Sequence, residues 1–248
     1  MIFGKNLSVE DSLKAYVKAG NTYSGPIPKG GISDLIFNLG KFGRSGNHIV
    51  FGKGCTVKAL AIVCPLGHAT MRFGDKTMIS GNVRIDPDCL LEVGNGTYFQ
   101  RPSRLVLYEG VKILIGKDCL FSNVVIRACD QHAIFDADSG DRINHSADIV
   151  IEDRVWLAEN VTVSKGLTIG SDTVIGSHSV VTKPIPPGCV AVGIPAEVKR
   201  TGIRWSKKLP REPAKPAKPY ESQPVAPVQP VPTVTRRWSA RLRSLILP

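Results

Sequence analysis

The chain has 248 residues, of which 42% are hydrophobic and 6% aromatic, as in a soluble protein with one large domain or two small ones. Its net charge of +11 is unevenly placed, because residues 201–248 hold ten basic and two acidic side chains. Residues 1–200 are left with +3, which argues against a nucleic-acid footprint on the folded part, so no nucleic-acid partner is expected.

The sequence shows neither a signal peptide nor a membrane span, so we expect a cytoplasmic protein. The opening segment MIFGKNLSVEDSLK lacks the apolar run of a signal peptide, and no stretch approaches the ~20 apolar residues of a membrane span. Six cysteines show no metal-ligand spacing. We expect them to be small buried thiols in a reducing compartment, as at Cys55, Cys89 and Cys119.

The first 50 residues are expected to cap one end of the fold. The segment LSVEDSLKAYVKAG predicts a short helix, with Ser8 as N-cap, Asp11 three places later and Gly20 as the stop. The next apolar segment, GISDLIFNLG, fits either a second helix or a strand.

A six-residue rhythm organises residues 51–204. It is interrupted up to residue 127 and unbroken over 151–183, where aliphatic residues open the blocks at Ile151, Leu157, Val163, Ile169, Ile175 and Val181. This period is neither helical nor a simple strand alternation, and it is typical of a parallel β-helix whose opening residues stack in one core. Arg127 stands at an opening place, where we expect the chain to leave the coil.

The excursion over residues 127–150 is the predicted functional loop. It holds five Asp and two of the five His, and contains little core-forming sequence. Ionisable groups on a loop that leaves a rigid scaffold commonly carry function.

The sequence after Lys183 changes in character. A cluster at Pro184, Pro186 and Pro187 is expected to end the solenoid. The Pro-rich segment 205–248 is expected to be extended and disordered. Its basic end, 234–248, fits either an amphipathic peripheral contact with the inner membrane face or a solvated tail.

Three motifs within residues 115–200 carry a family resemblance: DQHAIFD, INHSADIVIEDRVWLAENVTV and IGSDTVIGSHSVVTKPIPPGCVAVGIPAEVKR. They resemble the hexapeptide-repeat acyltransferases, in particular the maltose, galactoside and capsular-polysaccharide O-acetyltransferases. The resemblance implies an all-β, left-handed parallel β-helix. It also implies a homotrimer with sites between the copies, acetyl-CoA as the acyl donor, no metal, and a sugar or polysaccharide hydroxyl as the acceptor.

The resemblance also implies site residues. It places the catalytic histidine at His132 and an acceptor-lining tryptophan at Trp156. The implied coenzyme contacts are Ala158, Ser177, Thr182, Lys183 and Arg200. The usual V-W-I-G motif here ends in Leu157-Ala158, and His178 stands where many relatives have a small residue.

The chemistry of the loop fits acyl transfer. Imidazole exchanges protons near neutral pH, so His132 suits a general base for an attacking hydroxyl. Asp130 and Asp136 flank it, and either could hold its tautomer. His145 fits a second polar contact to the acceptor or an ordinary loop residue.

Three alternatives remain on the same scaffold. They are an acetyltransferase for serine or another small molecule, a non-catalytic β-helix, and a zinc enzyme of the γ-class carbonic anhydrase type. The zinc enzyme needs three converging His, two of them close in sequence, whereas His132 and His145 lie 13 residues apart.

Overall fold

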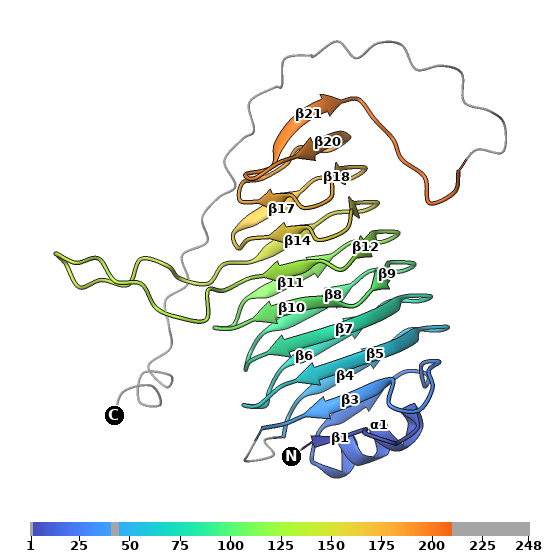
Figure 1. The fold of residues 1–248 in the computed structure, drawn as a ribbon. Coiled ribbons are helices and arrows are strands. Elements are labelled where there is room, and N and C mark those ends of the chain that lie inside the picture. The colour runs from blue at the N-terminus through green and yellow to red at the C-terminus, as the bar shows by residue number, and fades with distance from the viewer. Residues whose placement is uncertain (1, 41–44, 210–248) are drawn as a thin grey trace.

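The computed structural model describes residues 2–40 and 45–209. Short parallel strands stack as coils along one axis, from β1 to β21 (Figure 1). The expected all-β parallel solenoid is therefore confirmed. The predictions for residues 210–248, including the contact through 234–248, lie outside the described residues. The expected disorder is wrong for Trp205 and Lys207, whose side chains bond to the solenoid.

Each coil has three faces, which are built from two hydrogen-bonded sheets. The first face is a seven-stranded sheet of β2 (Thr22–Ser24), β4 (His48–Phe51), β6 (Thr70–Phe73), β8 (Leu90–Val93), β11 (Lys112–Ile115), β14 (Ile149–Ile151) and β17 (Leu167–Ile169). The second face holds β9 (Tyr98–Arg101), β12 (Leu120–Ser122), β15 (Trp156–Leu157), β18 (Val174–Ile175) and β20 (Cys189–Val192). The third face holds β3 (Leu35–Asn38), β10 (Ser103–Leu107), β13 (Val125–Arg127), β16 (Thr162–Val163) and β19 (Val180–Val181).

Two long strands join the second and third faces into one sheet. They are β5 (Thr56–Val63) and β7 (Met78–Ile85), which bend at the corner between these faces. Two short antiparallel pairings lie at the ends of the stack, where β1 (Ile2–Phe3) pairs with β3 and β21 (Glu197–Thr201) pairs with β20.

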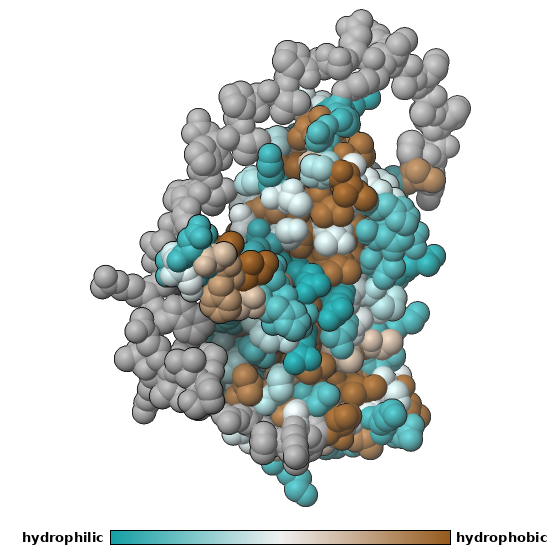
Figure 2. All heavy atoms as spheres, turned by 60° about the vertical axis from the view of Figure 1, so that its left-hand side comes forward, coloured by the Kyte–Doolittle hydropathy of each residue, from teal (hydrophilic) through white to brown (hydrophobic). Residues whose placement is uncertain are grey.

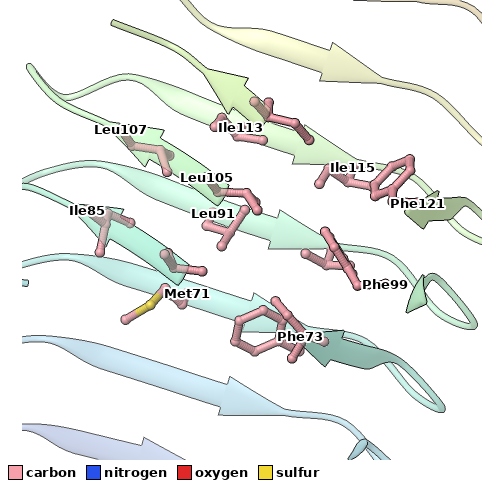
Figure 3. Packing of buried hydrophobic residues seen from close by; sticks show 14 of the residues in the cluster. Met71, Phe73, Ile85, Leu91, Phe99, Leu105, Leu107, Ile113, Ile115 and Phe121 are labelled. Atoms are coloured by element: carbon pink, nitrogen blue, oxygen red, sulfur yellow. The ribbon is translucent and has the colours of Figure 1, made fainter. Parts of the chain in front are cut away.

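The opening residues of the six-residue blocks form the core. The openers of the unbroken stretch are each at most 1% exposed, and they stack on equivalent residues one coil away. Aromatic openers also meet between coils: the Phe51 and Phe73 rings stack at 5.2 Å. The Phe99 and Phe121 rings meet edge to face at 5.0 Å (Figure 3). Because each coil buries its apolar side only against its neighbours, the stack fixes the corners from which loops leave.

The N-terminal segment begins with the predicted helix, α1 (Val9–Lys18). The backbone N–H of Asp11 donates to Ser8 Oγ at 3.1 Å, which confirms the cap. The ambiguous segment GISDLIFNLG contains strand β3, which pairs in parallel with β5. Because β2 also pairs with β4, parallel stacking begins before residue 51, and the expected cap contributes strands to the first coils.

Two details differ from the six-residue count. Ile126, rather than Arg127, takes the inward place between Leu105 and Val163, because the interval after Phe121 is one residue shorter where β12 shifts register against β9. The solenoid also continues beyond the proline cluster. Within the cluster, Ile185 N–H donates to Thr168 O at 2.9 Å, and beyond it β20 pairs with β18.

All six cysteines are buried free thiols, as expected for Cys55, Cys89 and Cys119. Burial raises the pKa of the Cys89 thiol to about 12 and that of Cys119 to about 11. In residues 2–40 and 45–209, no helix has the length and apolar character needed to cross a membrane.

Candidate functional site

The predicted functional loop is an arm that leaves the corner between the third and first faces. The arm, residues 128–148, lies between β13 and β14 and projects from the stack (Figure 1). Its outer part is a narrow hairpin, in which Ile143 N–H donates to Ile134 O at 2.9 Å and Asp136 N–H donates to Asp141 O at 2.8 Å. The loop therefore has a defined shape.

Asn144 organises the part of the arm that carries His132. Its side chain is 8% exposed, and its Nδ2 donates to His132 O at 2.8 Å and to Asp130 Oδ2 at 2.9 Å. Its Oδ1 accepts from Ile134 N–H at 2.7 Å. One buried amide thus bonds the backbone at the histidine, the backbone two residues after it and the Asp130 carboxylate two residues before it.

Asp130 is bound to the next coil. Lys165 Nζ forms an ion pair with Asp130 Oδ2 and also donates to Asn144 O at 3.0 Å. Burial opposes ionisation of Asp130, but the hydrogen bonds from Lys165 and Asn144 outweigh it and keep the pKa of Asp130 below its usual value. The expected pairing of Asp130 with the imidazole of His132 is not among its contacts, so Asp130 anchors the arm.

A second ion pair fastens the returning strand of the arm. Arg142 pairs with Glu109, and both side chains are about three-quarters buried. Glu109 Oε2 also accepts from Ser146 N–H at 3.1 Å. Burial would raise the pKa of Glu109, but its bonds to Arg142 and Ser146 lower it overall. Glu109 is therefore ionised and clamps the arm to the corner after β10.

Asp136 has a local role in the hairpin turn. Its Oδ1 accepts from Ser139 N–H at 2.9 Å and from Asp138 N–H at 3.1 Å, and these bonds lower the pKa of Asp136. The hydrogen bonds found for the Asp136 carboxylate are to this turn and not to the His132 imidazole, so the structure places Asp136 as a turn residue.

The two histidines of the arm are exposed, and Trp156 lies elsewhere. His132 and His145 both sit on the arm at the corner between the third and first faces. Trp156 is on β15 of the second face and is 36% exposed. One chain therefore does not bring His132 and Trp156 together.

Trp156 has an aromatic neighbour from beyond the solenoid. The ring of Trp205 lies 5.7 Å from that of Trp156, at 41° between the planes. Trp205 Nε1 donates to Arg154 O at 2.5 Å, and Lys207 Nζ donates to Gly96 O at 2.8 Å. Residues 203–207 thus form a strap that runs back along the corner between the first and second faces.

The expected coenzyme contacts fall in three places. Ala158 and Ser177 lie at the corner between the second and third faces, where Ala158 N–H donates to Ile175 O at 3.0 Å. Thr182 and Lys183 follow β19, at the same corner from which the arm leaves. Arg200 lies on β21 opposite Val190.

The sequence reading missed the residues that hold the site together: Asn144, Lys165, Glu109, Arg142 and Trp205. One signal could have pointed to Asn144: it lies in the polar sequence at the end of the excursion, among charged residues and outside the six-residue repeat. The partners of this Asn come from other coils, so no local pattern identifies them. In the described part of the chain, no three His, Cys, Asp or Glu side chains gather in the manner of a metal site.

The comparisons with known proteins agree with this architecture. Residues 148–183 match the family described as bacterial transferase hexapeptide (six repeats). The chain is 39% identical over 135 residues to the polysialic acid O-acetyltransferase of Escherichia coli O1:K1 / APEC, covering 52% of this chain and 44% of the relative. It is 33% identical over 130 residues to that of Neisseria meningitidis, covering 49% and 57%. The chain spans about half the length of these curated relatives.

A solved structure shares the fold over most of the chain. The polysialic acid O-acetyltransferase OatWY aligns with a TM-score of 0.66 and 29% identity, over 77% of this chain and 90% of that one. The matches in sequence and in structure confirm the resemblance seen in the motifs. Residues 148–183 therefore carry the bacterial transferase hexapeptide repeat, and the rest of the solenoid resembles O-acetyltransferases built on it.

Proposed function

We propose that this chain is an acetyl-CoA-dependent O-acetyltransferase that modifies a hydroxyl of a polysaccharide acceptor, with His132 as the general base. The observation that carries the proposal is the arm. A buried amide and two ion pairs hold a short loop rigidly outside the coil, and this loop presents an exposed imidazole. The names of two relatives, both polysialic acid O-acetyltransferases, favour a polyanionic glycan among the acceptors.

The proposed reaction requires a single proton relay. The imidazole of His132 takes the proton of the acceptor hydroxyl while its oxygen attacks the thioester carbonyl. The C–O bond forms, the C–S bond breaks, and the proton passes from the imidazolium to the leaving sulfur. Backbone N–H groups near the arm would stabilise the oxyanion.

Asp130 acts on this reaction indirectly. Its carboxylate is held by Lys165 and Asn144, and Asn144 in turn bonds the carbonyl of His132. Asp130 therefore helps to fix where the imidazole lies, and Asp136 shapes the hairpin beyond it. Lys183 and Arg200 supply positive charge suited to the phosphates of coenzyme A, with Ala158, Ser177 and Thr182 along its path.

The proposed site lies between copies of a homotrimer. The arm exposes Ile134, Phe135 and Ile143 by 54%, 60% and 62%, and these apolar side chains gather on the projection (Figure 2). The second face carries an outward apolar column in register, made of Met78, Tyr98, Leu120, Trp156 and Val174. Packing the arm of one copy against this face of the next would cover both surfaces and bring His132 toward Trp156.

Release of coenzyme A tests the proposal. Purified full-length chain is incubated with acetyl-CoA and a panel that includes sialic acid oligomers, neutral sugars and serine, and free thiol is measured. We expect turnover with a glycan, loss of turnover by at least about 100-fold in His132→Ala, and acetyl-CoA affinity within a few-fold of the wild type. Asp138→Asn, an exposed change at the arm's tip, is the matched control. A His132→Ala variant that keeps its rate would remove the residue from the mechanism, and turnover with serine alone would change the acceptor class.

A further inference from the structure

The strap has no counterpart in the six-residue repeat, yet it is anchored at both ends. Ile203 N–H donates to Gly188 O at 2.9 Å, and Lys207 Nζ reaches Gly96 O at 2.8 Å and Asp118 Oδ1 at 3.6 Å. These anchors lie four coil levels apart, or about 19 Å at ~4.8 Å per level. Four extended residues and a lysine side chain span about this distance, so the strap is drawn taut along the corner.

The middle of the strap fixes the Trp205 ring. Its indole N–H is occupied by Arg154 O, and the Arg154 guanidinium is itself held by two 2.7 Å bonds to Asp172. The indole N–H is therefore committed to the protein, and the ring offers its faces and edges to the surroundings. Its nearest aromatic neighbour is Trp156, in the apolar column of the second face.

The two indoles leave an apolar surface open. The two rings are tilted by 41° rather than stacked, and both side chains remain partly exposed. Leu120 and Val174 flank Trp156 in register on the adjacent coils. A pyranose ring has an apolar C–H face that fits such an aromatic wall, while its hydroxyls remain toward solvent and polar groups.

We propose that Trp205 is a second aromatic wall of the acceptor subsite, set beside Trp156 by the strap, and that a pyranose ring of the acceptor packs against the pair. This inference rests on the proposed function and adds a specificity-determining residue outside the repeat. Lys207 and the Arg154–Asp172 pair act through Trp205 as positioning residues.

Steady-state kinetics test this role in the full-length protein. With sialic acid oligomers as acceptor, Trp205→Ala should raise the acceptor KM by about tenfold, with kcat within about twofold and acetyl-CoA KM unchanged. Trp205→Phe keeps an aromatic ring and should cost about threefold or less. Lys199→Ala, on β21 beside the strap, is the matched control and should match the wild type. An unchanged acceptor KM in Trp205→Ala overturns the inference, even if its melting temperature falls.

A binding measurement separates this inference from the proposed function. In a Trp238→Phe background, sialic acid oligomers should quench the fluorescence of Trp156 and Trp205, and Trp205→Phe should remove part of the change. If the wild type releases no coenzyme A with any acceptor, the proposed function fails while this titration still decides the role of Trp205. Oligomer binding that is unaffected by Trp205→Phe and Trp205→Ala would overturn the aromatic wall.

Discussion

Replacing Asn144 by alanine should loosen the arm without unfolding the solenoid. The change removes the donors to Asp130 and to His132 O, and the acceptor of Ile134 N–H, all at 2.7–2.9 Å. A net hydrogen bond is worth about 0.5–1.5 kcal/mol, so three of them contribute about 2–4 kcal/mol. That free energy holds the arm in place, because the arm contributes no strand to the core.

The expected kinetic effect follows from this magnitude. Every 1.4 kcal/mol corresponds to a factor of ten, so kcat/KM should fall by roughly 30- to 700-fold if most of the loss appears as displacement of His132. Asn144→Asp has the same shape but puts a second carboxylate beside Asp130, and it should be at least as damaging. The global melting temperature should change little in both variants.

Three measurements together check the effect. They are the rate of coenzyme A release, the melting temperature, and hydrogen exchange of residues 128–148 compared with the coils. Asp138→Asn serves as the control on the same arm. Wild-type kcat/KM in Asn144→Ala, or faster exchange throughout the coils, would refute the idea that this amide acts locally on the arm.

Two other residues give independent predictions. Burial raises the pKa of the Asp86 carboxyl from 3.8 to about 6, with Arg84 opposing, and its Oδ1 is buried without a hydrogen-bond partner. Between about pH 4 and 6 the folded state binds this proton more tightly, so this group's contribution makes stability fall as pH rises through that window. Asp86→Asn should remove this pH dependence and raise the free energy of unfolding by about 1–2 kcal/mol at pH 7.5. This is less than the ~3 kcal/mol of the full pKa shift because the carboxyl is partly exposed. Urea unfolding that shows the same difference in stability between pH 5 and 7.5 in the variant as in the wild type would contradict this. Phe135→Asp should weaken association of the copies by about 10-fold or more per contact, seen as a lower mass in sedimentation, and a wild type that stays monomeric at all concentrations would rule out the proposed packing.

The sequence predicted those features that repeat. The spacing of residues such as Val163 and Ile175 identifies the inward positions of the unbroken stretch, because each inward side chain meets the same environment one level away. The helix cap at Ser8 is equally local, since donor and acceptor lie three residues apart. The excursion was recognised because its polar composition cannot fill a core.

The same reading failed where contacts join distant segments. Asp130 flanks His132 in sequence, which suggested a direct pairing, but its partner Lys165 lies 35 residues later in the next coil. The inward place of Ile126 depends on a one-residue register shift at the corner after Phe121, which spacing alone does not reveal. Trp205 stands in a segment without periodicity, so only the folded chain shows that it lies against Trp156.

Trp205 also shows that the repeat segment alone does not contain the complete proposed acceptor subsite. The matched family segment ends at residue 183, whereas the indole beside Trp156 belongs to a residue 51 positions beyond the Arg154 carbonyl that holds it. A fragment that ends after the last coil would keep all the stacked coils, but its Trp156 would lack the neighbouring ring of Trp205. During synthesis, likewise, the coils can stack as they emerge, but this corner is completed only after residues 203–207 have left the ribosome.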